Sequence, residues 1–445
     1  MSRLSISDGC MSLPPQARKR EMPYGVCCIL MGAKVHSNYR GKKGAVAVEA
    51  PDGWFVEMAE SDYQTAAKIA RDIEQTINIG RISSAQQMLA LHRIATSKLE
   101  AIGDERENLK GIAMLKDRSG SGYWRMVLPA KYMDKTDIYV DIAAGSTRFD
   151  YLLEYHTILV QRMHDWESYY MLKKLKDAGK RIIYDIDDDL FDIPDDNPAS
   201  KIIGRDDMMA AAECMKLADE VTTTTDVLQQ RLSGLINGKK PIVIPNALDP
   251  DDKWTPTPMT GSPDEWKRIF WQGSASHAED WMECVEAVDR IMQETKDVRL
   301  VLLGFLPPII AQYHSKPYWK GRVEYLGFND PETYFELVHH IRADVGIAPL
   351  RSLSFNFAKS CCKFVEFSVI GMPTVASGVA PYSPVIADNE NGFLAYDTDS
   401  WYNAIMLCLR NNKKRLDVVA QARKKVCEDF NIKKTAELWK KVLVP

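Results

Sequence analysis

Residues 355–377 read FNFAKSCCKFVEFSVIGMPTVAS, and this stretch decides the predicted fold. It opens with polar residues, continues as an apolar run and meets a Gly-Met-Pro break before the apolar segment 374–376. That order predicts a helix whose end leads into a buried parallel strand. Lys359, Lys363 and Glu366 are separated by four and three residues, so the predicted helix places these three side chains on one face.

The charges on this helical face predict a site for an anion and a sugar. Two ammonium groups near a helix N-terminus favour phosphate, because the helix dipole and the free backbone amides there attract negative charge. A carboxylate one turn further along can accept two hydrogen bonds from a sugar diol. The stretch therefore predicts a site that holds a nucleoside diphosphate by its phosphates and its ribose. The alternative is a solvent-exposed face with a Lys-Lys pair and a Lys-Glu contact.

The bulk composition is that of a globular chain with two or three domains. The sequence has 445 residues, of which 45% are hydrophobic and 27% are charged. Its net charge of -4 gives no overall attraction to nucleic acid or to an anionic membrane, although a local basic groove stays open. The longest apolar runs are strand-sized, far below the roughly 20 residues of a membrane span. Residues 1–23 lack the apolar segment of a secretory signal, so we expect a cytoplasmic protein, of a bacterium or of a phage-infected host cell.

The nine cysteines include the adjacent pairs Cys27-Cys28 and Cys361-Cys362, and none is spaced as C-x-x-C. An odd count at this spacing fits neither a zinc site nor a disulfide framework. We therefore expect free thiols in a reducing compartment.

Residues 1–110 predict an α+β accessory region to which the sequence assigns no function. Residues 1–22 are polar and irregular and are expected to form a mobile tail. Apolar residues at helical spacing predict two helices, at about Asp62–Ile79 and about Ser83–Ile102. Turn residues separate three runs that favour strands, namely Val26–Met31, Gly44–Glu49 and Gly53–Met58.

Residues 111–248 alternate between strand-like and helix-like segments, which predicts a parallel sheet with helices on its faces. Right-handed crossovers then give a doubly wound, Rossmann-like domain that binds ligands beyond the carboxyl ends of its strands. The predicted strands are Tyr123–Leu128, Ile138–Asp141, Thr157–Gln161, Arg181–Ile186, Glu220–Thr224 and Pro241–Ile244. The predicted helices are Ser146–Tyr155, Trp166–Ala178, Asp206–Ala218 and Asp226–Leu235.

Residues 249–430 predict a second Rossmann-like domain, after a linker rich in Pro, Asp and Thr that ends near Lys267. Residues 431–445 predict a C-terminal helix. The predicted strands of the second domain are Ile269–Gln272, Val298–Gly304, Val323–Leu326, Val345–Pro349, Thr374–Ala376 and Gly392–Leu394. Beside the central helix, the predicted helices are Trp281–Glu294, Pro331–Ile341, Trp401–Arg410 and Leu416–Phe430.

The order of these segments resembles the retaining GT-B glycosyltransferases of the family-four kind, over roughly residues 120–445. The central stretch matches the FN-x-x-KS-x-x-K-x-x-E pattern of one subgroup. The resemblance implies an α/β protein whose two Rossmann-like domains face a cleft, with a last helix that packs back onto the first domain. The segments that carry it, beside the central stretch, are EVTTTTDVLQQRL (220–232), PIVIPNALD (241–249), IFWQGSASHAEDW (269–281), VEYLGF (323–328), VGIAPL (345–350) and NENGFLAYD (389–397).

The resemblance implies that a nucleotide-sugar donor lies against three loops of the second domain. Gly273, Ser274 and His277 lie beside the diphosphate, where glycine permits a close approach and the polar groups donate hydrogen bonds. An ordinary capped turn is the alternative for this segment. Phe328 lies beside the base, unless it is a core side chain. The loop that contains Tyr382 offers further backbone amides to the phosphates.

In the central stretch the resemblance implies that Lys359 and Lys363 face the donor as catalytic residues and that Glu366 binds the ribose. The family pattern usually has a second glutamate, and Ala358 stands at its position. The carboxylate that contacts the transferred sugar is therefore missing there, and Asn356 or Lys359 is a candidate to replace it. Ser360 completes the predicted donor site.

The acceptor side of the predicted cleft carries acidic residues. Asp187, Asp188 and Asp189 follow a predicted strand, so they can bind acceptor hydroxyls, bind magnesium or manganese, or cap the next segment. We expect no metal site, because the GT-B fold generally works without one. Arg162 pairs with these acids or contacts the acceptor, and His164 is a candidate for sugar contact and catalysis, with a surface loop histidine as the alternative.

The sequence Gly120-Ser121-Gly122 precedes the predicted strand 123–128. A dinucleotide-binding fingerprint follows its strand. The glycines are therefore not assigned to a phosphate site.

The expected activity is transfer of a hexosyl or pentosyl group from a nucleoside diphosphate sugar to an acceptor hydroxyl, with retention at the anomeric carbon. A UDP-sugar is the expected co-substrate, with no prosthetic group and no divalent metal. Electrostatic stabilisation of the departing diphosphate is the expected main catalytic effect. The acceptor is a glycan or a hydroxylated DNA base, and a base has to be flipped out of its stack.

Two alternatives belong to other classes. The chain can be a catalytically silent GT-B-shaped binding or scaffold protein, with Ala358 as a sign of decay. It can also be a GT-B-shaped epimerase or phosphorylase, although a phosphorylase is expected to carry a pyridoxal-binding lysine motif that is not evident here. The sequence does not predict the oligomeric state.

Overall fold

The computed structural model describes the backbone of four strands before residue 59 and then residues 111–115, 120–133, 139–141, 152–153, 155–249, 264–328 and 331–443. The chain divides into two compact units, Met1–Leu109 and Lys110–Pro445. No helix in these described ranges is both long enough and apolar enough to span a membrane. The cysteines among the described residues are free thiols, as predicted.

The first unit contains a four-stranded sheet in the order β1-β4-β3-β2. β3 (Val46–Glu49) and β4 (Trp54–Met58) form an antiparallel pair that confirms two predicted strands. β1 (Arg18–Glu21) lies within the predicted tail 1–22, so that prediction was wrong at this point. Its backbone pairs with β4, and such pairing does not require apolar side chains. β2 (Lys34–Ser37) was not predicted, while the predicted strand 26–31 and both predicted helices lie outside the described residues.

The second unit begins with a six-stranded sheet in the order β10-β9-β8-β7-β5-β6, in which every pairing is parallel. The residues around this sheet, up to about 248, are called the first half below. The central strand β7 is buried along its whole length, as expected for a parallel sheet covered on both faces. The strands are β5 (Gly111–Met114), β6 (Tyr139–Asp141), β7 (Thr157–Gln161), β8 (Arg181–Asp185), β9 (Glu220–Thr223) and β10 (Ile242–Val243).

The helices α6 (Trp166–Asp177), α7 (Arg205–Leu217) and α8 (Asp226–Leu235) confirm three predicted helices of the first half. Side chains that the sequence places before two of them act as caps: Asp165 accepts a hydrogen bond from the Ser168 amide, and Thr225 accepts one from the Leu228 amide. The predicted helix 146–155 lies mostly outside the described residues.

The predicted strand Tyr123–Leu128 was wrong. Residues 120–130 are helical, as α3 (Gly120–Gly122), the π-helix η3 (Tyr123–Val127) and α4 (Leu128–Ala130), while the unpredicted β5 occupies the place in the sheet. The alternation in YWRMVL resembles a strand, but the helix buries its polar residue. The Arg125 guanidinium donates to the Asp185 carboxylate at 2.8 Å and to the Asn246 side chain at 3.1 Å.

The second half repeats the architecture with a parallel sheet in the order β13-β12-β11-β14-β15-β16. Its strands are β11 (Lys267–Gly273), β12 (Val298–Gly304), β13 (Val323–Leu326), β14 (Val345–Ala348), β15 (Thr374–Ser377) and β16 (Phe393–Ala395), all of them predicted. Its outer helices are α9 (Val285–Glu294), α10 (Pro308–His314), α11 (Pro331–Ile341), α14 (Thr398–Arg410) and α15 (Asn412–Asp429), of which only α10 was not predicted.

The predicted central helix is in fact two helices. α12 (Ser354–Phe357) and α13 (Cys362–Val369) are separated at residues 358–361. Every residue of α13 from Lys363 to Val369 is buried. Lys359 therefore lies in the break, and its position relative to Lys363 does not follow from helical spacing.

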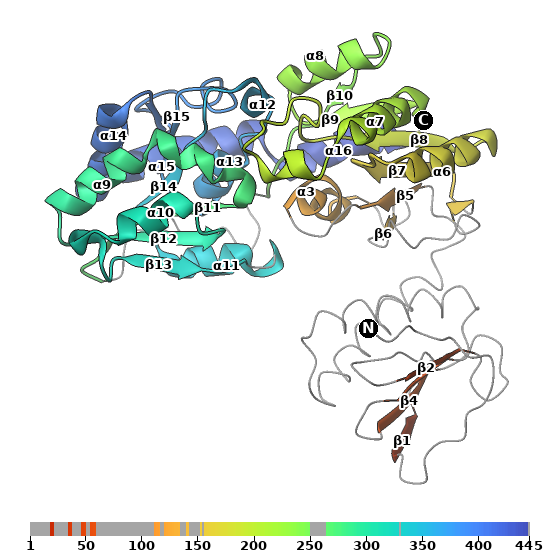
Figure 1. Ribbon diagram of the computed structural model, residues 1–445, viewed down its shortest axis with the longest axis horizontal. Helices are drawn as coiled ribbons and strands as arrows, with labels where there is room; N and C mark the ends of the chain where they lie inside the picture. The colour runs from red at the N-terminus through yellow and green to blue at the C-terminus, as the bar shows by residue number, and fades with distance from the viewer. Residues whose placement is uncertain are drawn as a thin grey trace. The chain divides into compact units, whose positions relative to one another are not determined.

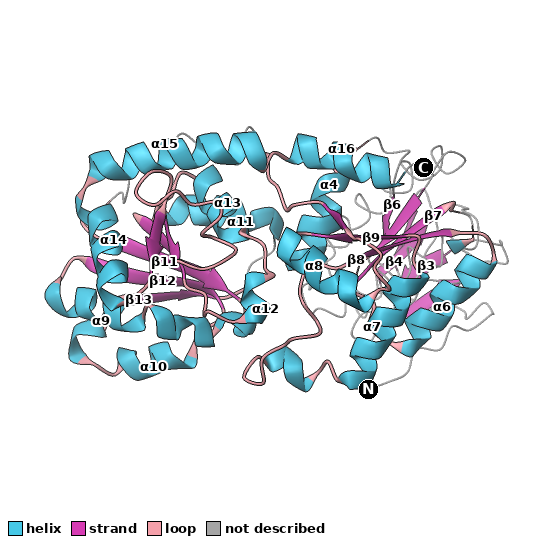
Figure 2. Ribbon diagram, turned by 90° about the horizontal axis from the view of Figure 1, so that it is seen from above, coloured by secondary structure: helices cyan, strands magenta, loops and turns pink. Residues whose placement is uncertain are grey.

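The last two helices follow one another along the same side of both halves (Figure 2). Backbone hydrogen bonds join Leu248 to both Phe430 and Ile432, where α15 passes into α16 (Ile432–Leu443). α16 buries Trp439 and Leu443 in a core shared with β5, β7 and β8 of the first half. The Trp439 ring also lies 5.1 Å from the Arg125 guanidinium, so the end of the chain braces the first sheet. This unit therefore contains the two predicted Rossmann-like α/β domains.

Candidate functional site

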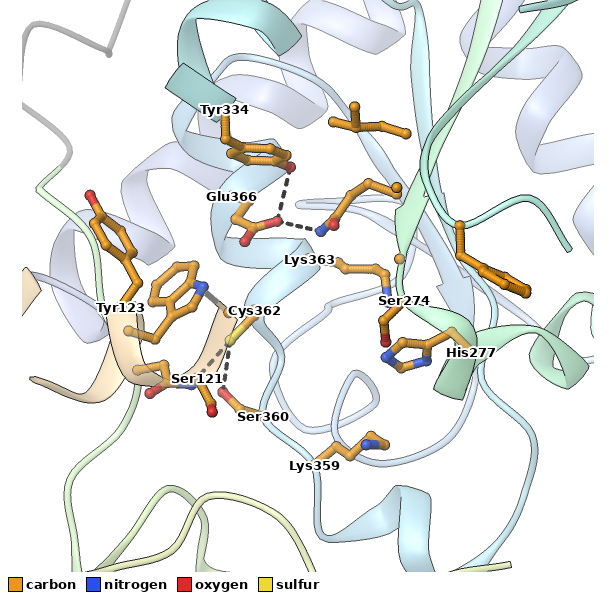
Figure 3. Close-up of a pocket in the computed structure, with 18 of the residues that line it drawn as sticks. Ser121, Tyr123, Ser274, His277, Tyr334, Lys359, Ser360, Cys362, Lys363 and Glu366 are labelled. Atoms are coloured by element: carbon orange, nitrogen blue, oxygen red, sulfur yellow. Dashed lines mark hydrogen bonds between the residues drawn. The ribbon is translucent and has the colours of Figure 1, made fainter. Parts of the chain in front are cut away.

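A cavity of about 580 Å³ lies at the carboxyl ends of the strands of both sheets, where a doubly wound fold binds ligands. Figure 3 shows most of the side chains that line it. The first half contributes helix residues 120, 121, 123 and 124 together with residues 187, 188 and 246. The second half contributes the strand ends 272–275 and 303–305 and residues 359, 360, 362, 363 and 366, among others. The site therefore depends on both halves of the unit.

Glu366 forms a polar corner of this cavity. Its carboxylate accepts hydrogen bonds from the Gln272 amide at 2.7 Å and from the Tyr334 hydroxyl at 3.1 Å, and the Trp124 indole donates a third. Burial raises the pKa of Glu366 to about 7, and these donors together with the Lys363 ammonium oppose the rise. A buried carboxylate within a set of fixed donors suits two hydroxyl groups of a ligand.

Lys363 lies one turn before Glu366 on α13 and points into the middle of the cavity toward Ser274 (Figure 3). Its side chain is buried, and within the described part of the chain it makes no ion pair or hydrogen bond. Burial lowers the pKa of Lys363, while the carboxylates of Asp280 and Glu366 counteract that effect. An ammonium group that is desolvated without a direct partner favours an anionic ligand.

Two glycines bring backbone close together beside Lys363. Gly273 ends β11, and a Cβ atom there would lie 2.6 Å from the Trp271 ring. Gly304, on β12, is the strand partner of Gly273. Its φ is +97°, and a Cβ atom there would lie 2.6 Å from the Gly273 carbonyl oxygen. The Phe305 amide donates to the same carbonyl at 2.8 Å. Only glycine fits both positions, and the turn Ser274–His277 starts from them.

His277 is a half-buried neutral base in this geometry. Its Nδ1 lies 2.8 Å from a carboxylate oxygen of Asp280, whose pKa is lowered by its hydrogen bond with His277 against the effect of burial. The ionised Asp280 can only accept, so Nδ1 carries the proton. Burial and the Lys363 ammonium lower the pKa of His277 to about 4. In the free protein the ring therefore supplies no positive charge, and its Nε2 is an acceptor.

Asn356 supports this histidine instead of lining the cavity. Its buried amide donates to Asp280 at 3.2 Å and to the Arg351 carbonyl at 3.0 Å. The Arg351 backbone amide donates to the same carboxylate at 3.0 Å. These donors fix Asp280, and Asp280 fixes the ring of His277.

Lys359 reaches the cavity from the break between α12 and α13. Its ammonium nitrogen lies 3.2 Å from the carboxylate of Asp188 in the first half and 4.3 Å from the centre of the Phe355 ring. Ser360, from the same break, also lines the cavity, while Ala358 is fully buried. Lys359 in the break, which sequence spacing did not indicate, thus makes a contact between the two halves.

The acidic run divides into separate roles. Asp187 and Asp188 line the cavity, whereas Asp189 is buried outside it and pairs with Arg231 at 2.7 Å. Burial raises the pKa of Asp187, and the Arg162 guanidinium at 3.3 Å opposes that rise. Among the described residues, no three His, Cys, Asp or Glu side chains gather into a set that could hold a metal ion.

Arg162, predicted to pair with the acids at 187–189 or to contact the acceptor, and His164, predicted for sugar contact, are not among the residues that line the cavity. Arg162 donates to the Ser121 hydroxyl at 2.9 Å and pairs with Asp187, so it positions two groups that line the cavity. His164 Nδ1 lies 2.9 Å from the Arg162 carbonyl. Phe328 and Tyr382 do line the cavity, the first largely exposed at the rim and the second buried.

Several lining residues were missed by sequence reasoning. Gly120 and Ser121 follow β5 and open a helix, whereas the sequence pattern predicts that they precede a strand at 123–128. Trp124, Gln272 and Tyr334 were not named because each comes from a different segment. The glycines on either side of Ser121 were a sequence signal for this part of the site. They fit a site after a strand once the strand is β5 and not residues 123–128.

Comparison with solved structures shows the fold. HepE from Anabaena, in complex with UDP-glucose, has a TM-score of 0.54 at 14% identity over 75% of this chain and 99% of that chain. Sucrose-phosphate synthase from Thermosynechococcus elongatus has a TM-score of 0.55 at 15% identity over 75% and 98%. A glycosyltransferase from Rickettsia africae has a TM-score of 0.52 at 14% identity over 76% and 98%.

A family model adds a match in sequence for the second half. It is described as glycosyl transferases group 1 and covers residues 267–411, which include the strand end at Gly273 and the whole of α13. No curated protein matches the sequence. The chain therefore has the GT-B fold, and its residues 267–411 match the glycosyl transferases group 1 model.

Proposed function

We propose that this protein transfers a sugar from a nucleoside diphosphate sugar, a UDP-sugar first of all, to an acceptor hydroxyl. The observation that carries the proposal is the buried Lys363 ammonium, which lies one helical turn from the Glu366 carboxylate and opposite the Gly273-Ser274 turn. A cation without a direct partner beside a diol-binding carboxylate matches the two polar parts of a nucleoside diphosphate. The group 1 domain at 267–411 supports the same assignment.

In this proposal the parts of the donor follow one another along the cavity. The ribose hydroxyls lie at Glu366, and the diphosphate lies between Lys363 and the turn after Gly273. The base extends toward Phe328 at the exposed rim. The transferred sugar then lies toward Lys359, Ser360 and the first half, where an acceptor can approach.

The catalytic contribution of these residues is electrostatic. When the bond between the sugar and the diphosphate breaks, negative charge develops on the leaving phosphate. Lys363 and the backbone amides of the turn are already in place to stabilise that charge, with Lys359 available from the break. Two lysines can supply the charge that a divalent cation supplies elsewhere, so we propose transfer without metal. Retention at the anomeric carbon is proposed on the FN-x-x-KS-x-x-K-x-x-E pattern.

Two carboxylates serve the acceptor in this proposal. Asp187 and Asp188 line the cavity from the first half, where they can accept hydrogen bonds from acceptor hydroxyls. In the first half, no Lys or Arg lines the cavity among the described residues.

A thermal-shift screen with UDP, GDP, ADP and their sugars, with and without EDTA, tests the proposal. A ligand that binds only the folded state raises the melting temperature. The proposal predicts a shift with one nucleotide family that persists in EDTA, followed by release of sugar from the matching donor. The product's anomeric configuration, read by NMR, decides retention. No shift with any nucleotide at millimolar concentration would favour a silent scaffold instead.

A further inference from the structure

An acidic segment of the first half lies between the two halves beside α12, in yellow-green in Figure 1. We call residues 187–201, between β8 and α7, the acidic strap. Three of its carboxylates reach the second half. Asp188 pairs with Lys359 at 3.2 Å, Asp192 hydrogen-bonds the Ser354 hydroxyl, and Asp196 accepts two hydrogen bonds from the Arg351 guanidinium at 2.6 and 2.9 Å.

The strap is also anchored within its own half. Arg231 on α8 pairs with Asp189 at 2.7 Å and with Asp192 at 2.6 Å, and it donates to the Ser354 carbonyl at 2.9 Å. Ser354 therefore receives contacts from two residues of the first half. Thr225, at the start of α8, adds a hydrogen bond to the Ala358 carbonyl at 2.9 Å. The strap is thus a fixed element that reaches the other half.

All of these contacts meet the second half within residues 351–359. The same residues hold the donor site, because the Arg351 amide and the Asn356 side chain fix Asp280 and Asp280 fixes His277. The short helical turn Pro198–Lys201 of the strap also lies close to the turn Ala275–His277. The hydrogen bonds at residues 351–359 and the neighbouring turn therefore both relate the strap to the groups beside the proposed phosphate site.

We propose that Asp196 is a positioning residue whose paired hydrogen bonds with Arg351 hold the cleft closed and align the donor site. The inference rests on the proposed function for the identity of the ligand, but the closure itself does not. A bidentate guanidinium–carboxylate pair fixes orientation as well as distance. Closing and opening are an equilibrium, so loss of one pair shifts the closed population and lowers the apparent affinity for any ligand that needs both halves.

The test compares Asp196→Asn with Asp195→Asn in the full chain. Both variants remove one negative charge from adjacent exposed positions, but the Asp195 side chain makes no ion pair or hydrogen bond within the described part of the chain. Hydrogen exchange of peptides that cover residues 351–359, measured without ligand, reports opening. Calorimetry with UDP reports the affinity of the site. Asp196→Glu keeps a carboxylate and is the rescue variant.

The proposal predicts several-fold faster exchange at residues 351–359 and several-fold weaker UDP binding in Asp196→Asn than in Asp195→Asn, with partial recovery in Asp196→Glu. Added salt should reduce the difference, because it screens exposed charges. Equal exchange and equal affinity in the two asparagine variants would overturn the proposal. If the wild-type protein binds no nucleotide, the proposed function is wrong, and the exchange comparison still decides for or against the strap.

Discussion

Nδ1 of His277 lies 2.8 Å from a carboxylate oxygen of Asp280, and burial together with the Lys363 ammonium lowers the pKa of the same ring. Asp280 is itself held by the Arg351 amide and by Asn356. The ring is therefore fixed and neutral at the place where a diphosphate is proposed to bind. The protonation state of His277 should therefore change when a charged ligand binds in the site.

The first prediction concerns the protonation of His277. Its pKa of about 4 in the free protein means that the ring stays neutral across the physiological range. A bound diphosphate brings negative charge close to the ring, which favours the protonated form and raises the pKa. We expect a rise of about one unit or more with saturating UDP. The measurement is NMR titration of labelled histidine, with His277→Asn to assign the signal. A free-protein pKa near the usual 6.5, or no change with UDP, contradicts the site geometry.

The second prediction concerns Glu366 and pH. Its pKa of about 7 means that the carboxylate prevails above this pH and the neutral acid below it. Ribose hydroxyls donate to the carboxylate, so affinity for UDP-glucose should rise as pH increases from 6 to 8 and then level off. In Glu366→Gln the affinity should fall about tenfold and lose this pH dependence, since a hydrogen bond to a charged group contributes about 1.5–3 kcal/mol. Calorimetry at several pH values measures both.

The ligand supplies the control for Glu366. The 2′-deoxyuridine analogue of UDP-glucose lacks one ribose hydroxyl. It should therefore bind the wild type more weakly than UDP-glucose does, whereas Glu366→Gln should bind the two donors about equally well. An equal loss in both proteins would place the ribose away from Glu366.

The third prediction separates a steric effect from backbone strain. Gly304 and Gly321 both have positive φ, +97° and +75°, but a Cβ atom meets the Gly273 carbonyl oxygen at 2.6 Å only in the first case. Gly321→Ala should cost about 1–2 kcal/mol of unfolding free energy from strain alone. Gly304→Ala should cost clearly more and also weaken UDP binding, because the Gly273 turn must move. Urea denaturation gives the free energies. If the two variants lose the same unfolding free energy, the ends of β11 and β12 can move apart without cost, which would contradict the prediction.

The parts of the candidate site that depend on local spacing could be predicted from the sequence. Lys363 and Glu366 are one turn apart on a single buried helix, so their shared face follows from helical periodicity. Gly273 and Ser274 follow a strand whose apolar residues are evident from the sequence. The two parallel sheets likewise follow from the alternation of β and α segments.

The remaining parts depend on contacts between distant segments. Lys359 lies in a helix break, and its ammonium group pairs with Asp188, about 170 residues earlier in the chain. The run 123–128 alternates as a strand does, yet it forms a helix because Arg125 finds buried partners at Asp185 and Asn246. Asn356 was expected to touch the donor, but its amide is used by Asp280. Periodicity in one segment does not contain such information.

The most direct test of the proposed donor site is calorimetry with UDP on the wild type, Lys363→Met and Lys173→Met. Methionine keeps an unbranched chain without the charge, and Lys173 is an exposed α6 residue paired with Asp177, so it controls for the loss of one lysine. The account predicts that Lys363→Met weakens UDP binding at least tenfold, while Lys173→Met binds as the wild type does. Unchanged binding in Lys363→Met would contradict the proposal that this buried ammonium holds the diphosphate.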